Sequence, residues 1–280
     1  MKKRLCCFIL AFILIAICQA GCGKKDNGMK KVVLNEVAHS IFYAPQYVAI
    51  EMGYFKDAGI DLVLETGFGA DKTMTALISG NADIGFMGSE STIYAYAEGS
   101  KDYAVNFAGL TQRAGNFLVA REKIDNFSWD MVKGKNVLGG RKGGMPQMVL
   151  EYILKANNID PASDLSIDQS VDFGLTAGAF SGNTEYDFTV EFEPGATSLE
   201  KEGKGYVVAS LGVDSGYVPY TAYSAKKSYI EKNPEIIKDF TSAIQKGLDY
   251  VNSHSSAEIA KVIAPQFEDT DIDTITTIVE

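Results

Sequence analysis

The feature that most constrains the fold is the regular alternation of short apolar runs with helical segments along residues 31–280. Such alternation is typical of α/β folds with parallel strands, because each helix returns the chain to the same end of a sheet. The sequence therefore predicts an α/β protein. The expected strands are Lys31–Asn35, Ile60–Glu65, Ile84–Met87, Tyr103–Leu110, Phe117–Arg121, Asn136–Gly139, Ser166–Gln169, Asp187–Glu191, Tyr206–Leu211 and Pro219–Ser224.

Residues that favour helix ends mark the segments between these strands. Asp71 and Ser89 are expected to cap helices with their side-chain oxygens, and Gly80 to end one. Pro146 and Pro234 suit the first turns of two further helices. The helix after Pro234 has the clearest apolar stripe, formed by Ile236, Ile237, Phe240, Ile244, Leu248 and Val251.

A second cycle of strands and helices opens near Ser128, with no low-complexity linker before it. If the two cycles form two lobes, ordered strands should carry the chain between them. Phe117–Arg121 and Pro219–Ser224 are the candidates for these crossings. The expected helix Asp271–Glu280 stops without a Gly, Pro or polar tail, so we expect the natural protein to be longer.

The N-terminal residues 1–21 have the layout of a secretory signal. Met1–Arg4 is basic, Leu5–Ile17 is almost entirely apolar, and small residues precede Cys22. The apolar run is shorter than the roughly 20 residues of a membrane span. A cysteine at this place resembles the bacterial lipobox, which implies a diacylated Cys22, although Gln19 stands where that pattern prefers an aliphatic residue. The alternative is an ordinary cleaved signal.

These features predict a lipid-anchored protein on the extracytoplasmic face of the cell membrane. The polar residues 22–31 would then form a tether between the lipid and the folded domain. The lipid anchor would be its only membrane contact.

Composition excludes several functional classes. Loss of residues 1–21 changes the formal charge from −10 to −13, so phosphates of nucleic acids and anionic lipid headgroups would be repelled. Past Cys22 the chain has no cysteine, and its only histidines are His39 and His254. Thiolate and multi-histidine metal sites are therefore not expected, and no cofactor is implied.

Five motifs, each weak alone, occur in the order and spacing of a known family. They resemble those of the solute-binding proteins of ABC importers in the sulfonate/thiamine-pyrimidine branch. The matching segments are Asn35–Phe55 with its Pro45 and Gly53-Tyr54-Phe55, Gly59–Leu62, Ala76–Gly85, Glu193-Pro194 and Asn233-Pro234.

The resemblance implies a bilobed fold like that of periplasmic binding proteins, with two α/β lobes joined by two hinge strands. Lobe 1 would comprise residues 32–117 and 221–280, and lobe 2 residues 118–220. Such proteins bind a small solute between the lobes, close around it, and deliver it to an ABC permease and its ATPase. A monomer without catalytic groups would suffice for this task.

Candidate ligand contacts in the first lobe follow its strands. After the first strand, His39 could hydrogen-bond a heterocycle nitrogen, or it could simply be a capping or solvated histidine. Gly67 and Gly69 would let backbone amides approach an oxygen atom, or form a plain turn. Glu90 could face an aminopyrimidine or only favour the helix dipole. The full set of candidates is His39, Ser40, Phe42, Tyr43, Gly67, Gly69, Ser89 and Glu90.

Candidates in the second lobe and the hinge are chiefly charged groups and glycines. Arg113 and Arg141 could pair with a carboxylate or sulfonate, or form surface ion pairs. Glu191 could hold an amino group or cap the next helix. The glycine-rich loop lacks the Gly-Lys-Ser/Thr ending of a P-loop. The full set of candidates is Arg113, Arg141, Gly143, Gly144, Glu191 and Tyr220.

Several functions remain open at this stage. His39, Glu90 and the aromatic residues favour a thiamine-type pyrimidine precursor, whereas the two arginines favour a sulfonate or another oxyanion. The family also resembles fungal pyrimidine synthases, which use a reactive histidine and a cysteine-rich iron site that this chain lacks after Cys22. An extracellular sensory module of the same fold is the third possibility.

Overall fold

The structure, a computed structural model, describes residues 28–280. Residues 31–280 form one compact unit, to which the following description applies. The expected signal 1–21, the lipidation site Cys22 and most of the expected tether lie outside the described residues. Within residues 28–280, no helix is long and apolar enough to cross a membrane.

The first sheet has five strands in the order β2-β1-β3-β10-β4. β1 and β3 pair in parallel, while β10 runs antiparallel to both β3 and β4. Its strands are β1 (Lys30–Glu36), β2 (Ile60–Thr66), β3 (Ile84–Gly88), β4 (Ala104–Thr111) and β10 (Thr221–Lys226).

The second sheet also has five strands, in the order β7-β6-β8-β5-β9. β6 pairs in parallel with β7 and β8, and β5 runs antiparallel to β8 and β9. Its strands are β5 (Asn116–Ala120), β6 (Asn136–Leu138), β7 (Ser166–Asp168), β8 (Phe188–Phe192) and β9 (Tyr206–Ser210).

The chain passes between the sheets twice. Residues 112–115 lead from β4 into β5, and residues 216–220 lead into β10. The two segments expected to cross, Phe117–Arg121 and Pro219–Ser224, correspond to β5 and β10. These strands directly follow the crossings and belong to the sheets that the chain enters. The expected parallel strands are present in both sheets, but β5 and β10, which enter from the other sheet, run antiparallel to their new neighbours. The two-lobed α/β fold is confirmed.

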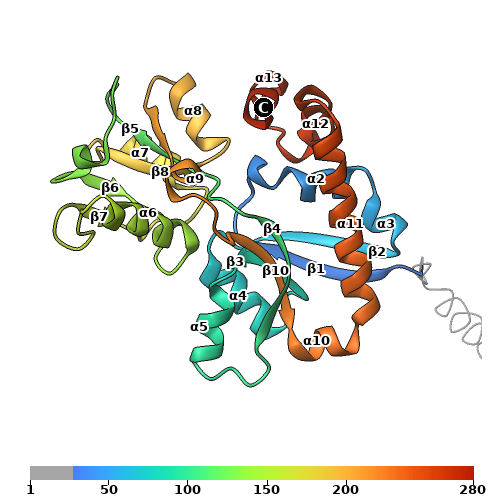
Figure 1. The fold of residues 1–280 in the computed structure, drawn as a ribbon. Helices are drawn as coiled ribbons and strands as arrows, with labels where there is room; N and C mark the ends of the chain where they lie inside the picture. The colour runs from blue at the N-terminus through green and yellow to red at the C-terminus, as the bar shows by residue number, and fades with distance from the viewer. Residues whose placement is uncertain (1–27) are drawn as a thin grey trace, which may run out of the picture. The chain divides into compact units, whose positions relative to one another are not determined.

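Helices of the first lobe form two groups on the sheet. α2, α3, α11 and α12 pack together, whereas α4 packs on β3 and α5 (Figure 1). The described part of this lobe also has the short 3-10 helices η2 (Ile41–Tyr43) and η4 (Ala264–Gln266). The α-helices are α2 (Ala44–Glu51), α3 (Tyr54–Asp57), α4 (Ala70–Ser79), α5 (Ser91–Ala97), α10 (Lys227–Lys232), α11 (Pro234–Ser253), α12 (Ser256–Ile263) and α13 (Ile272–Val279).

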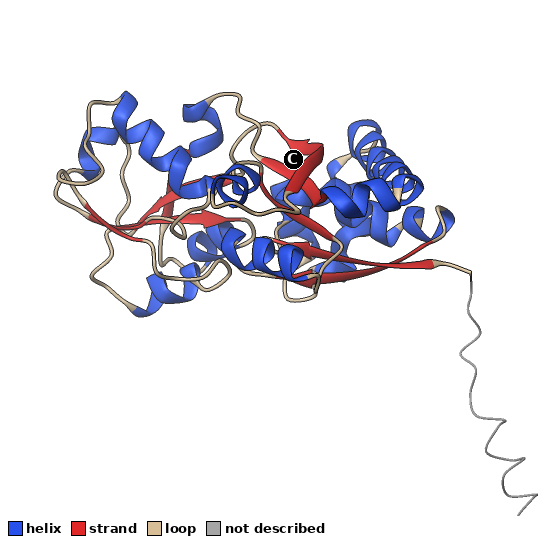
Figure 2. Ribbon diagram, turned by 90° about the horizontal axis from the view of Figure 1, so that it is seen from below, coloured by secondary structure: helices blue, strands red, loops and turns tan. Residues whose placement is uncertain are grey.

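The second lobe has fewer helices. α6 packs on α9, while α7 and α8 lie against β8. Figure 2 shows helices on both sides of the strands. The helices of the second lobe are η3 (Trp129–Val132), α6 (Met145–Ala156), α7 (Thr176–Gly182), α8 (Gly195–Lys201) and α9 (Leu211–Ser215). The sequence located α6 correctly, from the proline in its first turn.

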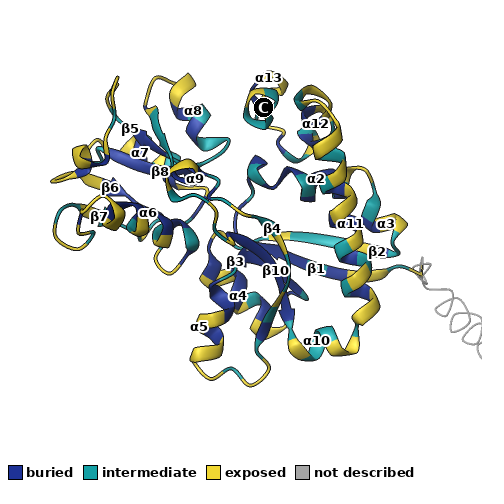
Figure 3. Ribbon diagram, in the orientation of Figure 1, coloured by how far each residue is buried: buried dark blue, intermediate teal, exposed yellow. Residues whose placement is uncertain are grey.

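Burial is concentrated on the sheets and on the helix faces that cover them (Figure 3). Separate apolar clusters form within each lobe. Phe173 of lobe 2 nevertheless belongs to the cluster of lobe 1, and Phe42 and Phe192 pack against the clusters of both lobes. The two cores therefore meet through aromatic side chains.

The expected helix end at Gly80 is confirmed, whereas the expected N-caps Asp71 and Ser89 were wrong. Gly80 ends α4 in the left-handed region, as its position predicted. Asp71, however, lies in the first turn of α4, whose N-cap is Gly69, because its carboxylate is bound by an arginine of the other lobe. Ser89 precedes the N-cap Glu90 of α5, and its hydroxyl donates instead to the Pro219 carbonyl at 2.6 Å.

The crossing of α11 and α2 depends on one glycine. A Cβ atom at Gly247 would lie well inside contact distance of the Pro45 carbonyl oxygen and 3.2 Å from the Ala49 side chain. The two helices can therefore approach closely only with glycine at this position.

We expect Gly247→Ala to destabilise the fold by about 1–3 kcal/mol, because the helices must separate to admit the methyl group. Urea unfolding followed by circular dichroism measures this change. Gly178→Ala in α7 is the matched control, since a Cβ there meets nothing within 4 Å. Equal stability of the two variants would contradict this account of the helix crossing.

Candidate ligand-binding site

The buried carboxylate of Glu36, at the end of β1, organises the edge of the site. It accepts hydrogen bonds from His39 Nδ1 (2.7 Å), Gln46 Nε2 (2.7 Å) and the hydroxyls of Tyr47 (2.9 Å) and Thr66 (3.1 Å). Four donors compensate the loss of water around this charge. The loop after β1, helix α2 and the end of β2 are thereby tied together.

His39 is held on both sides by protein groups. Its Nδ1 faces Glu36, and its Nε2 lies 2.7 Å from the Gln266 carbonyl oxygen. Burial alone would lower the pKa of His39, but the hydrogen bonds to Glu36 and Gln266 and the charge of Glu36 raise it. Because both ring nitrogens already lie within hydrogen-bond distance of protein oxygens, neither remains for a heterocycle.

Ser40 and Phe42 of lobe 1 are in contact with lobe 2, so their side chains are not free to contact a ligand. The Ser40 hydroxyl donates to the Glu193 carbonyl of the second lobe at 2.7 Å. The Phe42 ring lies 6.4 Å from the Phe192 ring and 5.9 Å from the Tyr220 ring. Gly115, in the first crossing, leaves room for Phe42, since any Cβ there would overlap that ring.

Two voids lie between the lobes, on either side of Phe173 and Phe192, whose rings are 5.8 Å apart. The smaller, of about 10 Å³, is lined by both lobes; the larger, of about 310 Å³, lies beside His39 and Glu191. The smaller void is bounded by Val37, Tyr43, Ala70, Gly88, Gly144, Met145, Pro146, Phe173, Phe192, Tyr220 and Thr221. It is a closed cleft.

Glu90 lies beside the smaller void. Glu90 is 5% exposed, its side chain folds back over Gly88, and neither carboxylate oxygen makes a hydrogen bond of normal geometry among the described residues. Burial raises the pKa of Glu90 to about 7, although the backbone amides of Glu90 and Met145 and the nearby Ser91 hydroxyl oppose the shift. The charge of Glu90 in turn raises the pKa of Tyr220, in addition to the larger effect of burial. Burying a carboxylate without hydrogen bonds costs free energy, so a donor from a bound ligand would stabilise Glu90.

Glu191 is equally buried but is satisfied within the protein. The Thr176 hydroxyl donates to its Oε2 at 2.8 Å and the Thr189 hydroxyl to its Oε1 at 2.6 Å. Burial raises the pKa of Glu191 to about 7. Its neighbour Glu193, which precedes the N-cap Pro194 of α8, accepts hydrogen bonds from the amide and hydroxyl of Thr197 in the first turn of that helix.

Arg141 bridges the lobes. Its Nε and Nη2 donate to the two oxygens of Asp71 at 2.8 Å, and its Nη1 donates to Asp172. Lys72 of lobe 1 binds the other oxygen of Asp172 at 2.5 Å. The hydrogen bonds from Arg141 hold the pKa of Asp71 below its usual range. We call these four residues the interlobe ion network.

The two glycines after β2 serve packing. A Cβ at Gly69 would lie 2.8 Å from Arg141 Cδ, and one at Gly67 would lie 2.7 Å from Asn35 Oδ1. The amide of Gly67 already donates to the Glu36 carbonyl at 2.8 Å. Of the loop glycines after β6, Gly144 lines the smaller void, and the amide of Gly143 donates to Gln147 at 2.5 Å.

The remaining candidates divide between the cleft and the hinge. Tyr43 and Tyr220 are fully buried and line the smaller void. Arg113 instead donates to the Gly212 carbonyl at 3.0 Å and stacks on Tyr217, with 4.1 Å between its guanidinium carbon and the ring centre. Arg113 therefore stabilises the second crossing.

Sequence reasoning missed the residues that the second lobe contributes from loops. Phe173 and Phe192 line both voids, and Asp172 completes the interlobe ion network. All three follow or end strands of the second sheet, and the rule that ligands bind beyond strand ends could have indicated them. Within residues 28–280, no cluster of three or more His, Cys, Asp or Glu could hold a metal ion.

Two α/β lobes with two crossings and a cleft between them define the fold of the solute-binding proteins of ABC importers. The model of the NMT1/THI5-like family matches residues 41–257. The chain is also 48% identical, over 269 residues, to YtlA of Bacillus subtilis (strain 168), which is assigned as a binding protein; the match covers 96% of this chain and 79% of YtlA. The protein belongs to the NMT1/THI5-like family.

Two further comparisons bear on the fold and the family. The alkanesulfonate-binding protein SsuA from Xanthomonas axonopodis pv. citri, bound to MOPS, superposes with a TM-score of 0.72 at 15% identity, covering 89% of this chain and 83% of SsuA. The 4-amino-5-hydroxymethyl-2-methylpyrimidine phosphate synthase of Candida albicans (strain WO-1) is 24% identical over 239 residues, 76% of this chain and 64% of the synthase.

The interlobe ion network should hold the lobes closed in a salt-dependent way, because its members are partly exposed. We expect Arg141→Gln to weaken closure by about 1–2 kcal/mol, summed over its ion pairs. Small-angle X-ray scattering should then show a larger radius of gyration for the variant, and for the parent at about 1 M salt.

Lys133→Gln is the matched control, because the ion pair of Lys133 with Asp130 stays within lobe 2. Scattering curves that do not change with Arg141→Gln or with salt would show that other contacts close the lobes.

Proposed function

We propose that this protein captures a small solute between its lobes and delivers it to an ABC permease and its ATPase. Membership of the family, the two-lobed fold and the cleft support this function. A cleft closed by Ser40, Phe42 and Arg141 must open to admit a ligand, and such opening is the motion that a hinge of two crossings allows.

We propose further that the ligand is a flat, amine-bearing heterocycle of the thiamine-pyrimidine type. The observation that carries this proposal is Glu90, a buried carboxylate without a hydrogen-bond partner in the part of the chain that the structure describes. Tyr43, Phe173 and Tyr220 surround the void beside it with aromatic surface. An amino group would supply the missing donors, and the rings would pack on a flat heterocycle.

A sulfonate or other oxyanion is the second candidate, favoured by the likeness to SsuA. Against it stands the fact that Arg141 and Arg113, the arginines that the sequence suggested for an anion, already bind protein groups. Arg141 is bound by two aspartates and Arg113 by a carbonyl and a tyrosine ring. An anion at Glu90 would also meet a carboxylate rather than a donor.

A binding role is favoured over catalysis by the state of His39. The pyrimidine synthases that the sequence resembles rely on a reactive histidine, whereas both ring nitrogens of His39 are occupied by Glu36 and Gln266. We propose that His39 fixes the fold around the cleft. Deletion of the gene distinguishes import from a sensory role. Loss of solute uptake would support import, and unchanged uptake would support a sensory role.

We propose that Cys22 is lipidated and holds the protein at the extracytoplasmic face of the membrane. The proposal rests on the basic, apolar and small-residue segments that precede this cysteine. The rest of the chain would extend from the lipid.

The ligand proposal predicts that 4-amino-5-hydroxymethyl-2-methylpyrimidine binds the purified full chain and that Glu90→Gln weakens binding about 10- to 100-fold. Loss of a charged hydrogen bond costs about 1.5–3 kcal/mol. Titration calorimetry measures both affinities. Glu191→Gln is the control, because Thr176 and Thr189 already satisfy that carboxylate. Tighter binding of an alkanesulfonate, unchanged in Glu90→Gln, would replace the pyrimidine by the oxyanion.

The carboxylate of Glu90 should also make both the stability of the free protein and its affinity for the ligand depend on pH. The pKa of Glu90 is raised from 4.5 to about 7, so the free protein loses stability as the pH rises through this range. The ionised form accepts the stronger hydrogen bonds, and affinity for the pyrimidine should therefore increase between pH 6 and pH 8 in the parent and stay flat in Glu90→Gln.

For the anchor, we expect Cys22→Ser to abolish incorporation of labelled palmitate and to move the protein from the membrane fraction to the medium or periplasm. The cysteines of the apolar run, such as Cys18, serve as controls and should tolerate the same substitution. Membrane retention of Cys22→Ser would refute the lipid anchor.

A further inference from the structure

The smaller void beside Glu90 has too little room for a heterocycle. Its volume is about 10 Å³. That is about the room that one water molecule needs, whereas pockets for small molecules begin at about 300 Å³. The larger void, at about 310 Å³, reaches this size. Since the rings of Phe173 and Phe192 line both voids, they form a wall between the two spaces, which we call the aromatic wall.

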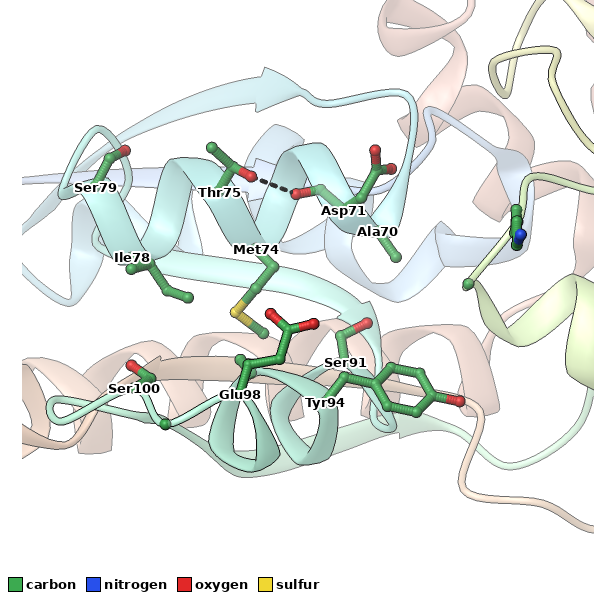
Figure 4. A pocket seen from close by; sticks show the side chains of 14 residues that line it. Ala70, Asp71, Met74, Thr75, Ile78, Ser79, Ser91, Tyr94, Glu98 and Ser100 are labelled. Carbon is green, nitrogen blue, oxygen red and sulfur yellow. Dashed lines mark hydrogen bonds between the residues drawn. The ribbon is translucent and has the colours of Figure 1, made fainter.

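The wide groove between α4 and α5 is a separate space from this wall. Figure 4 shows Met74 and Ile78 of α4 and Tyr94 of α5 along its sides. The groove has a volume of about 740 Å³, but neither Phe173 nor Phe192 lines it. A change in the aromatic wall would therefore enlarge the smaller void toward the larger one and leave the groove unchanged.

The two rings of the aromatic wall are held in different ways. Phe192 ends β8, where it pairs with Asn116 of β5, and its ring lies 6.4 Å from the ring of Phe42. Phe173 lies in the loop between β7 and α7, outside any helix or strand. The residue after it, Gly174, has a φ of +85°, a conformation that glycine adopts readily and other residues do not. The chain can therefore turn at Phe173 more easily than at Phe192.

The loop around Phe173 is also in contact with lobe 1. Asp172 binds Arg141 within the interlobe ion network, and a Cβ at Gly174 would lie 3.3 Å from the ring of Phe68 in lobe 1. The ring of Phe173 is 5% exposed and belongs to the apolar cluster of lobe 1. Opening of the lobes would separate this ring from that cluster, so the ring can take a new position when a ligand enters.

We propose that Phe173 is the movable part of the aromatic wall: its ring turns into the larger void when a ligand binds, and it thereby sets the size of the solute accepted beside Glu90. This inference rests on the proposed function and adds a residue that determines its specificity. Aromatic and apolar side chains of the larger void, among them Phe68, would pack on the turned ring. The space that the ring leaves would join the smaller void and hold the heterocycle.

Filling the larger void tests this inference without changing Glu90 or the aromatic wall. Ala177 of α7 lines the larger void but not the smaller one. Ala177→Phe should leave Phe173 no room to turn and weaken binding of 4-amino-5-hydroxymethyl-2-methylpyrimidine to the full chain about tenfold, the usual cost of crowding a packed site. Titration calorimetry measures this change. Gly178→Phe is the matched control, because it adds the same ring at the next residue of α7, where a Cβ meets nothing within 4 Å.

A second variant, Phe173→Ala, removes the movable ring and should admit larger amines. The probe is 4-aminoquinazoline, in which a benzene ring is fused to the aminopyrimidine. We expect the parent to prefer the single-ring pyrimidine, and Phe173→Ala to reduce this preference about tenfold. A merely structural role of Phe173 would change the stability of the protein but not the ratio of the two affinities.

Thermal unfolding followed by circular dichroism shows which variants are folded, and if Ala177→Phe is not, the affinity ratio in Phe173→Ala decides. An unchanged affinity in folded Ala177→Phe, or an unchanged ratio in Phe173→Ala, overturns the movable ring. The proposed function then still stands if Glu90→Gln weakens binding of the pyrimidine. If the pyrimidine binds neither the parent nor Phe173→Ala, the proposed ligand has failed and the movable ring fails with it.

Discussion

The buried carboxylate of Glu36 is the interaction on which the first lobe's ligand-facing edge depends. It gathers donors from the loop after β1, from α2 and from the end of β2, and through His39 it reaches the Gln266 carbonyl near the C-terminal helices. A charge inside a protein is tolerated only when such donors surround it. The same requirement fixes the positions of Ser40 and Phe42, which follow in the chain and touch the second lobe.

Contacts of three physical kinds hold the lobes together. A hydrogen bond joins Ser40 to Glu193, aromatic rings meet at Phe42 and Phe192, and Arg141 binds aspartates from both lobes. The aromatic contact is apolar and insensitive to salt, whereas the ion network is partly exposed and screened by it. Only part of the contact between the lobes therefore depends on salt. A ligand shifts the lobes toward closure by as much as it binds the closed form more tightly than the open one.

Two glutamates in the cleft show how similar burial serves different purposes. Burial raises the pKa of both Glu90 and Glu191 to about 7. The oxygens of Glu191 are satisfied by Thr176 and Thr189, which makes it part of the architecture. Glu90 makes no well-formed hydrogen bond, although the Ser91 hydroxyl and two backbone amides lie near it, and an aromatic void lies beside it. The absence of a partner, more than the perturbed pKa, makes Glu90 the ligand group.

The sequence alone determined the order of strands and helices, because apolar periodicity, Gly80 after α4 and Pro146 in α6 act on their own neighbours. It also placed Glu90 and Tyr220 among the residues near the cleft, since these follow or precede strands of the first sheet. Tertiary structure decided the rest. Arg141 became a bridge to Asp71 and His39 a structural clamp, because their partners come from segments about 70 to more than 200 residues away. Local patterns carry no information about which distant charge will satisfy a side chain.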